Sequence, residues 1–172
     1  KAYCVVNCYN PLGRNTILFD NDVAGVAITT PDELVVLEGQ TVNVPVRLNT
    51  EPKKDVKIKV ELSNKEAHTD VEEITLNSEN WKEGVIVHIS GTQDEMIDGD
   101  KPFDMTFTFT SDDESYQAIE PMKISGTVKD ADTAEIFVSM GDAPIVKEGS
   151  SDFVTMSLSL SSKPTAAVDV AI

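Results

Sequence analysis

Five carboxylates crowd into one short segment of the sequence, GTQDEMIDGDKPFDMTF at Gly91–Phe107. They belong to Asp94, Glu95, Asp98, Asp100 and Asp104. Like charges at this density repel one another unless a cation lies among them or water screens them. Carboxylate oxygens are hard ligands, which suit calcium far better than zinc or copper. The segment is therefore a candidate cation-binding loop, and the alternative is a solvated acidic loop that only raises solubility.

The other reactive side chains form no catalytic pattern. Cys4 and Cys8 leave three interpretations open: a disulfide closed by a tight turn, a weak zinc-type pair, or two buried or externally paired cysteines. His68 and His88 are far apart in sequence and lie in no nucleophile or metal motif, so we interpret both as surface or strand residues. No GxSxG, HExxH, P-loop or Rossmann motif occurs. We therefore expect no catalytic residues and no enzymatic activity.

The acidic segment lies among stretches in which apolar and polar residues alternate with period two. The apolar positions are Val44, Val46, Leu48, Val56, Ile58, Val60, Leu62, Val85, Val87, Ile89, Phe103, Met105, Phe107 and Phe109. This alternation is typical of half-buried strands in antiparallel sheets, and Gly, Pro, Asn and Asp separate the stretches. We predict an all-β antiparallel β-sandwich in which Phe103, Phe107, Val46 and Val87 face the core.

Segments of the chain also repeat at a nearly constant offset. FDNDVAGVAI at 19–28 resembles KDADTAEIFV at 129–138, and LEG at 37–39 resembles KEG at 147–149, both 110 positions later. RLNTEPKKDVKIKV then aligns with SLSSKPTAAVDVAI after two inserted residues. Such self-similarity indicates tandem repeats. We divide the chain into the tail of one repeat (1–22), a complete repeat (23–132) and the first strands of a third (133–172), and expect an excerpt of a longer polypeptide.

An ordered set of motifs in this repeat resembles the Calx-beta module. The motifs are VLEGQTVNVPVRLNTEP, LNSENWKEGVIVHI, DEMIDGDKPFDMTF, SDDESYQ and TVKDAD. The resemblance implies a seven-stranded, immunoglobulin-like sandwich of the kind found in sodium/calcium exchangers and in long surface proteins built of tandem copies. It also implies that calcium, where it binds, lies at one end of the sandwich near the next module.

Carried over motif by motif, the resemblance places metal ligands in three separate segments. Met96 falls on a position that can offer its backbone carbonyl. The carboxylates are Glu38, Asp94, Glu95 and Asp98, with Asp100 as a further candidate, and Asp130 and Asp132. Gln93, Lys101 and Ala131 stand where richly loaded members carry acids. We therefore expect one or two weakly bound calcium ions, with Lys101 turned outward.

Ordinary structural roles compete with the functional ones at other positions. The acidic pairs at Asp20–Asp22 and Asp130–Asp132 are also typical of turns between modules. SDDESY at 111–116 is better explained as a hairpin loop than as a second ion site. Trp81, the single tryptophan, is expected to pack against the sandwich edge rather than to stack on a sugar.

The charge balance limits the partners of the chain. Its 30 acidic and 14 basic residues give a net charge of −16, which argues against nucleic acid and anionic membranes. No apolar run is long enough to insert in a bilayer. With the resemblance, this favours a spacer in an extracellular or cell-surface filament or adhesion protein, whose partners are neighbouring repeats and other filament subunits. The alternatives are a ligand-binding adhesin module and a calcium sensor of a larger membrane protein.

Overall fold

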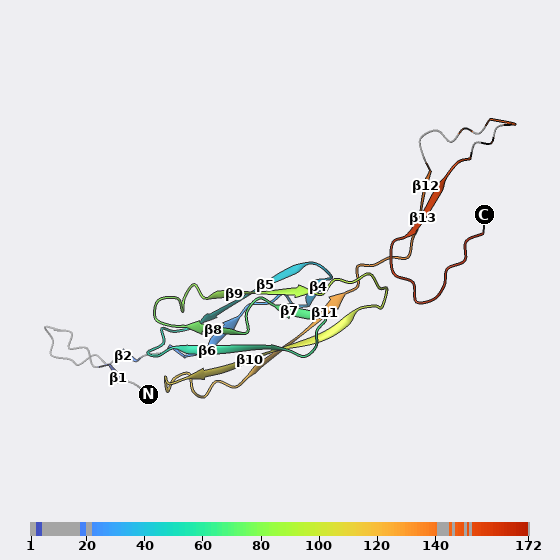
Figure 1. The fold of residues 1–172 in the computed structure, drawn as a ribbon. Coiled ribbons are helices and arrows are strands. Elements are labelled where there is room, and N and C mark those ends of the chain that lie inside the picture. The colour runs from blue at the N-terminus through green and yellow to red at the C-terminus, as the bar shows by residue number, and fades with distance from the viewer. Residues whose placement is uncertain are drawn as a thin grey trace, which may run out of the picture.

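The computed structural model describes residues 3–4, 18–19, 22–140, 145, 147–149, 151 and 153–171, and among these residues it contains strands and no helix. The all-β prediction is confirmed. No helix in the described part of the chain is long and apolar enough to cross a membrane. Residues 22–132, which we call the central unit, carry two sheets. Figure 1 shows the short hairpins β1–β2 and β12–β13 at opposite ends of this unit.

The central unit contains a four-stranded sheet and a five-stranded sheet. The first is antiparallel throughout, in the order β3 (Val26–Ile28), β5 (Thr41–Leu48), β9 (Val85–Gly91), β7 (Ala67–Thr69). The second runs in the order β4 (Leu34–Leu37), β11 (Met122–Lys129), β10 (Lys101–Ser111), β6 (Val56–Leu62), β8 (Glu73–Leu76). Its single parallel pair is β4 with β11, which brings Leu37 beside Lys129. Both strands therefore end at the same edge.

One hydrophobic core lies between the two sheets, an arrangement consistent with a β-sandwich. Every second residue of β6 and of the first part of β10 is buried, as the period-two pattern requires. The predicted inward positions are confirmed, since Phe103, Phe107, Val46 and Val87 are each at most 2% exposed. The expected count of seven strands is wrong, because nine lie between residues 26 and 129. The short strands β3, β7 and β8 are too brief for alternation to reveal them.

The loop after β10 is fastened to the loop after β5 by buried polar side chains. The Tyr116 hydroxyl donates to the Thr50 carbonyl at 2.7 Å and lies 2.8 Å from the Thr50 hydroxyl. Asp113 accepts from the Lys53 amide at 2.7 Å and from the Ser115 amide at 3.0 Å. These hydrogen bonds, the Lys53 amide first, hold the pKa of Asp113 below its usual value. The SDDESY segment is thus a structural loop.

Tyr116→Phe is expected to lower the free energy of unfolding by about 1–3 kcal/mol, because the Thr50 carbonyl loses its buried donor. Urea unfolding followed by circular dichroism measures the change. The exposed-site control Thr75→Val should leave the midpoint nearly unchanged. An unaltered midpoint in Tyr116→Phe would show that the hydroxyl does not hold the two loops together.

Two further hairpins flank the central unit. β1 (Tyr3–Cys4) pairs with β2 (Leu18–Phe19), whereas Cys8 lies outside the described residues, so the Cys4–Cys8 alternatives stay open. β12 (Ile136–Met140) pairs with β13 (Met156–Leu160) and aligns Ile136 with Leu160.

The register of β12–β13 matches that of β3–β5 at the offsets found in the sequence. Val26 faces Leu48 as Ile136 faces Leu160, at offsets of 110 and 112. The amide of Asn49 donates to the carbonyl of Gly25, and that of Ser161 donates to Glu135 in the same way. This agreement supports the predicted repeat for its first strands, while the repeat array itself stays a prediction.

Candidate functional site

The candidate site lies at the edge where β4, β9 and β11 end. Glu38 follows β4, and its amide donates to the Lys129 carbonyl at the end of β11 at 3.1 Å. Glu38 also forms a parallel bridge with Gly91, the last residue of β9. The acidic loop (residues 92–100) starts there and leads into β10. Backbone pairing alone therefore joins segments that are more than 30 residues apart in sequence.

Three carboxylates converge at this edge, and we call them the acidic cluster: Glu38, Asp94 and Asp132. One oxygen from each lies within 4.8 Å of the others. Oxygens that bind one calcium ion at 2.3–2.6 Å lie at most about 5 Å apart, so the three oxygens are close enough to share an ion. Glu38 is only 7% exposed, and Oδ2 of Asp132 is buried without a hydrogen-bond partner. A buried carboxylate oxygen without a donor is costly, and a cation would satisfy it.

The electrostatics of the acidic cluster favour neutralisation. Burial raises the pKa of Glu38 above its usual value, with further contributions from Asp130, Asp94 and Asp132 against one hydrogen bond from the Ala131 amide. Burial likewise raises the pKa of Asp132, followed by the charges of its acidic neighbours. In both cases the charged form of the carboxyl group is disfavoured, and a nearby positive charge would stabilise it.

Asp130 organises the acidic loop instead of joining the cluster. Its Oδ2 accepts from the amides of Asp98 at 2.9 Å and Gly99 at 2.8 Å, and its Oδ1 accepts from the Asp132 amide at 2.8 Å. These bonds, the one from Gly99 first, lower the pKa of Asp130. Gly99 has a φ of 79°, which favours glycine. Asp100 supports the same turn, since its Oδ1 accepts from the Asp130 amide at 3.2 Å.

Lys101 does not turn outward, and that expectation is wrong. Its ammonium lies 3.1 Å from Oδ2 of Asp98 and donates to the Asp98 carbonyl at 3.0 Å. The Lys101 side chain is 31% exposed. Its ammonium neutralises Asp98 within the loop.

The structure thus separates the seven predicted ligands into two groups. It brings Glu38, Asp94 and Asp132 together. The others have different contacts in the described structure: Glu95 through its backbone carbonyl, and Asp98, Asp100 and Asp130 through the hydrogen bonds and ion pair of the loop. Met96 contributes its amide, which donates to Oδ1 of Asp94 at 2.7 Å. Sequence reasoning missed the organising role of Asp130, although the Asp-Gly pair at Asp98–Gly99 signals a turn that needs acceptors.

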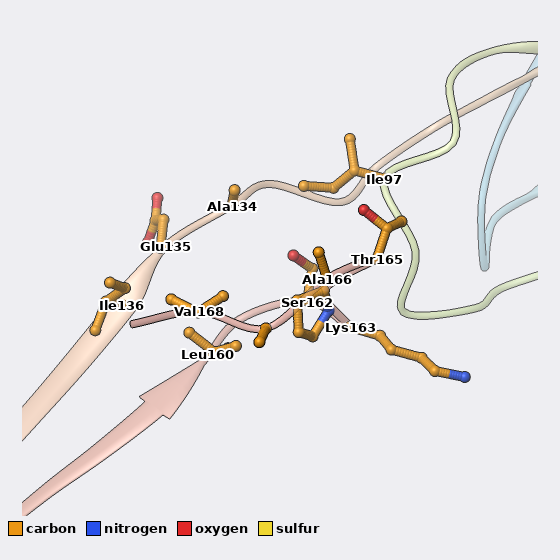
Figure 2. A pocket seen from close by; sticks show the side chains of 12 residues that line it. Ile97, Ala134, Glu135, Ile136, Leu160, Ser162, Lys163, Thr165, Ala166 and Val168 are labelled. Atoms are coloured by element: carbon orange, nitrogen blue, oxygen red, sulfur yellow. The ribbon is translucent and has the colours of Figure 1, made fainter. Parts of the chain in front are cut away.

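The acidic loop also contacts the segment that follows β13. The Lys163 amide donates to the Glu95 carbonyl at 2.6 Å. Beside this bond lies a mainly apolar cavity of about 500 Å³, and Figure 2 shows Ile97 at one end of it and Ile136, Leu160 and Val168 gathered at the other. The remaining lining residues are Ala134, Glu135, Ser162, Lys163, Pro164, Thr165, Ala166 and Ala167.

Comparisons with known proteins do not assign this site. No model of a known protein family matches the chain. A search of curated proteins likewise finds no similar sequence.

Proposed function

We propose that this chain is a non-catalytic spacer built from Calx-beta-like, immunoglobulin-like sandwich modules in a long extracellular or cell-surface protein, and that its acidic cluster binds one calcium ion. The convergence of Glu38, Asp94 and Asp132 carries the proposal. Three segments supply one carboxylate each to a single point, and the carboxylate of Asp132 has an oxygen that is buried without a donor. The ligand set offers oxygen alone, which favours calcium over zinc or copper.

The composition of the acidic cluster supports one weakly held ion. Three carboxylates provide three negative charges, and water and backbone carbonyls would complete the six to eight oxygens that calcium requires. Lys101 already neutralises Asp98, and three backbone amides already occupy Asp130. Few charged ligands remain for a second ion, and calcium affinity decreases as the number of charged ligands decreases.

The contact between the acidic loop and Lys163 supports a mechanical role for the ion. Asp94 belongs to the cluster, and its neighbour Glu95 accepts the hydrogen bond from the Lys163 amide. Ile97, two residues further along, lines the apolar cavity with residues of the following segment. An ion that fixes Asp94 therefore also fixes the loop that contacts the next part of the chain. Binding would stiffen this junction, because an ion stabilises the state that binds it.

Millimolar calcium is expected to raise the melting temperature of the chain, since a ligand at ten times its dissociation constant adds about 1.4 kcal/mol to the stability. Calcium should also slow hydrogen exchange at the Lys163 amide. Magnesium should do much less, because it demands near-ideal octahedral geometry. Differential scanning fluorimetry and amide exchange by NMR measure the two effects.

The matched control for the calcium effect is Asp112→Asn, which removes an exposed carboxylate from the other end of β10. It should leave the calcium response intact, whereas Asp94→Asn should remove it while keeping the acceptor for the Met96 amide. A melting temperature of the unmodified chain that does not change in millimolar calcium would contradict calcium binding. A rise in melting temperature without slower exchange at the Lys163 amide would contradict only the stiffening of the junction and not calcium binding.

A further inference from the structure

The two histidines of the chain lie on one face of one sheet. His68 is on β7 and His88 is on β9, which are antiparallel neighbours. His68 pairs with Ser90, so Asp70, two residues further along, comes opposite His88. Ala67, Ile89 and Gly91 on the same strands are buried, and therefore His68, Asp70 and His88 point away from the core. Sequence separation hides this grouping, and only the strand register reveals it.

Asp70 and His88 are held together by three hydrogen bonds. Nδ1 of His88 lies 2.7 Å from Oδ2 of Asp70, and the His88 amide donates to Oδ1 at 2.9 Å. The Asp70 amide donates to the His88 carbonyl at 3.3 Å. The bond from the His88 amide, followed by that from its ring, lowers the pKa of Asp70. Asp70 is therefore a fixed, ionised carboxylate beside an imidazole nitrogen, and both side chains are close to half exposed.

We propose that His68, Asp70 and His88 form a binding site for a transition-metal ion of the zinc class. The ion would replace the proton between Nδ1 of His88 and Oδ2 of Asp70. Two ligands of a tetrahedral zinc ion, each about 2.0–2.1 Å from the metal, lie about 3.3 Å apart, so the 2.7 Å pair needs to open only slightly. Nδ1 offers its lone pair when the neutral imidazole carries its proton on Nε2, so the Nδ1 proton passes to Nε2 by exchange with solvent as the metal binds.

His68 supplies the third ligand in this site. Residues i and i+2 of a strand share a face and are roughly 6.6 Å apart, and diagonal neighbours on adjacent strands are about 7–8 Å apart. The His68 ring does not lie within ligand distance of the Asp70–His88 pair. The His68 side chain is exposed, and we infer that it rotates about its side-chain bonds to reach the ion. Ser90, which lies opposite His68, is engaged with the Thr41 hydroxyl at 2.8 Å. Two imidazoles, one carboxylate and a water molecule then complete four-coordination.

This site differs chemically from the acidic cluster and does not depend on the proposed function. The acidic cluster offers carboxylate oxygens alone, whereas the histidine site offers two nitrogens and one oxygen. Nitrogen donors favour zinc, cobalt, nickel and copper over calcium. The two sites should therefore be filled by different ions in the same solution.

Zinc chloride titration by calorimetry tests the proposal, in the full chain with Cys4 and Cys8 replaced by serine and with millimolar calcium present. These conditions remove the thiols and occupy the acidic cluster. We expect one zinc ion per chain at this site, and His68→Ala, His88→Ala and Asp70→Asn should each weaken binding at least about tenfold. Asp104→Asn, which removes a partly exposed carboxylate paired with Lys123 on the other sheet, is the control and should not change zinc affinity.

The imidazole signals of the otherwise unmodified chain provide a second readout that does not depend on the folding of the variants. Zinc should shift the ring signals of both His68 and His88 in proton–carbon NMR spectra, with the same midpoint as the calorimetric titration. Calcium should shift neither. Absence of zinc binding, a shift of only one ring, or equal affinity in His88→Ala and the parent would overturn the proposal.

Discussion

Replacing Phe107 with alanine is expected to lower the free energy of unfolding of the central unit by about 3–5 kcal/mol. Phe107 is fully buried in β10, between Val60 on β6 and Met122 on β11 in the sheet register. Its ring belongs to the core shared by the two sheets, so truncation removes apolar contacts and leaves a cavity. Urea unfolding followed by circular dichroism measures the loss.

The control for Phe107 is Ile86→Ala on β9. Ile86 is also an apolar strand residue, but it is 48% exposed, and surface substitutions usually change stability by no more than about 0.5 kcal/mol. A similar loss in both variants would contradict the assignment of inner and outer faces. Gly84→Ala, just before β9, should also lower the free energy of unfolding, because a Cβ there would clash with the Val46 carbonyl oxygen.

The sequence predicted the long strands because each has one buried and one exposed face. Seven residues of β6 and eleven of β10 are enough for period two to be recognised. Three residues of β7 are not enough, and the parallel pairing of β4 with β11 leaves no local signal. Pairing between distant segments depends on tertiary packing, which alternation does not encode.

The candidate site was predictable at the level of segments but not of side chains. The repeat and the family resemblance indicated that residues near 38, 94–100 and 130–132 belong to one end. Which carboxylates meet there depends on hydrogen bonds that the sequence does not reveal. Asp98 is paired with Lys101, and Asp130 accepts three backbone amides, so neither turns a free carboxylate to the cluster. His68 and His88 come onto one face only through the register of β7 and β9, which the sequence does not reveal.

Asp132→Asn is expected to change the stability of the chain in opposite directions with and without calcium. Without an ion, the raised pKa values of Glu38 and Asp132 mean that the folded chain binds protons more tightly than the unfolded chain. Its free energy of unfolding therefore falls as the pH rises from the usual carboxyl values through the raised ones. Asparagine cannot ionise, so the variant should melt above the parent at neutral pH in chelator and show a weaker fall with pH.

In millimolar calcium the order of the two melting temperatures should reverse. The parent gains the stabilisation of the bound ion, whereas the variant has lost one of three charged ligands and should bind calcium at least about tenfold more weakly. Melting curves at pH 4 to 8, in chelator and in calcium, measure both effects on the same pair of proteins. Asp112→Asn should follow the parent in every condition. If Asp132→Asn melted below the parent in chelator as well, repulsion within the acidic cluster would be contradicted. Asp132, with its buried oxygen, would then stabilise the fold through contacts of its own.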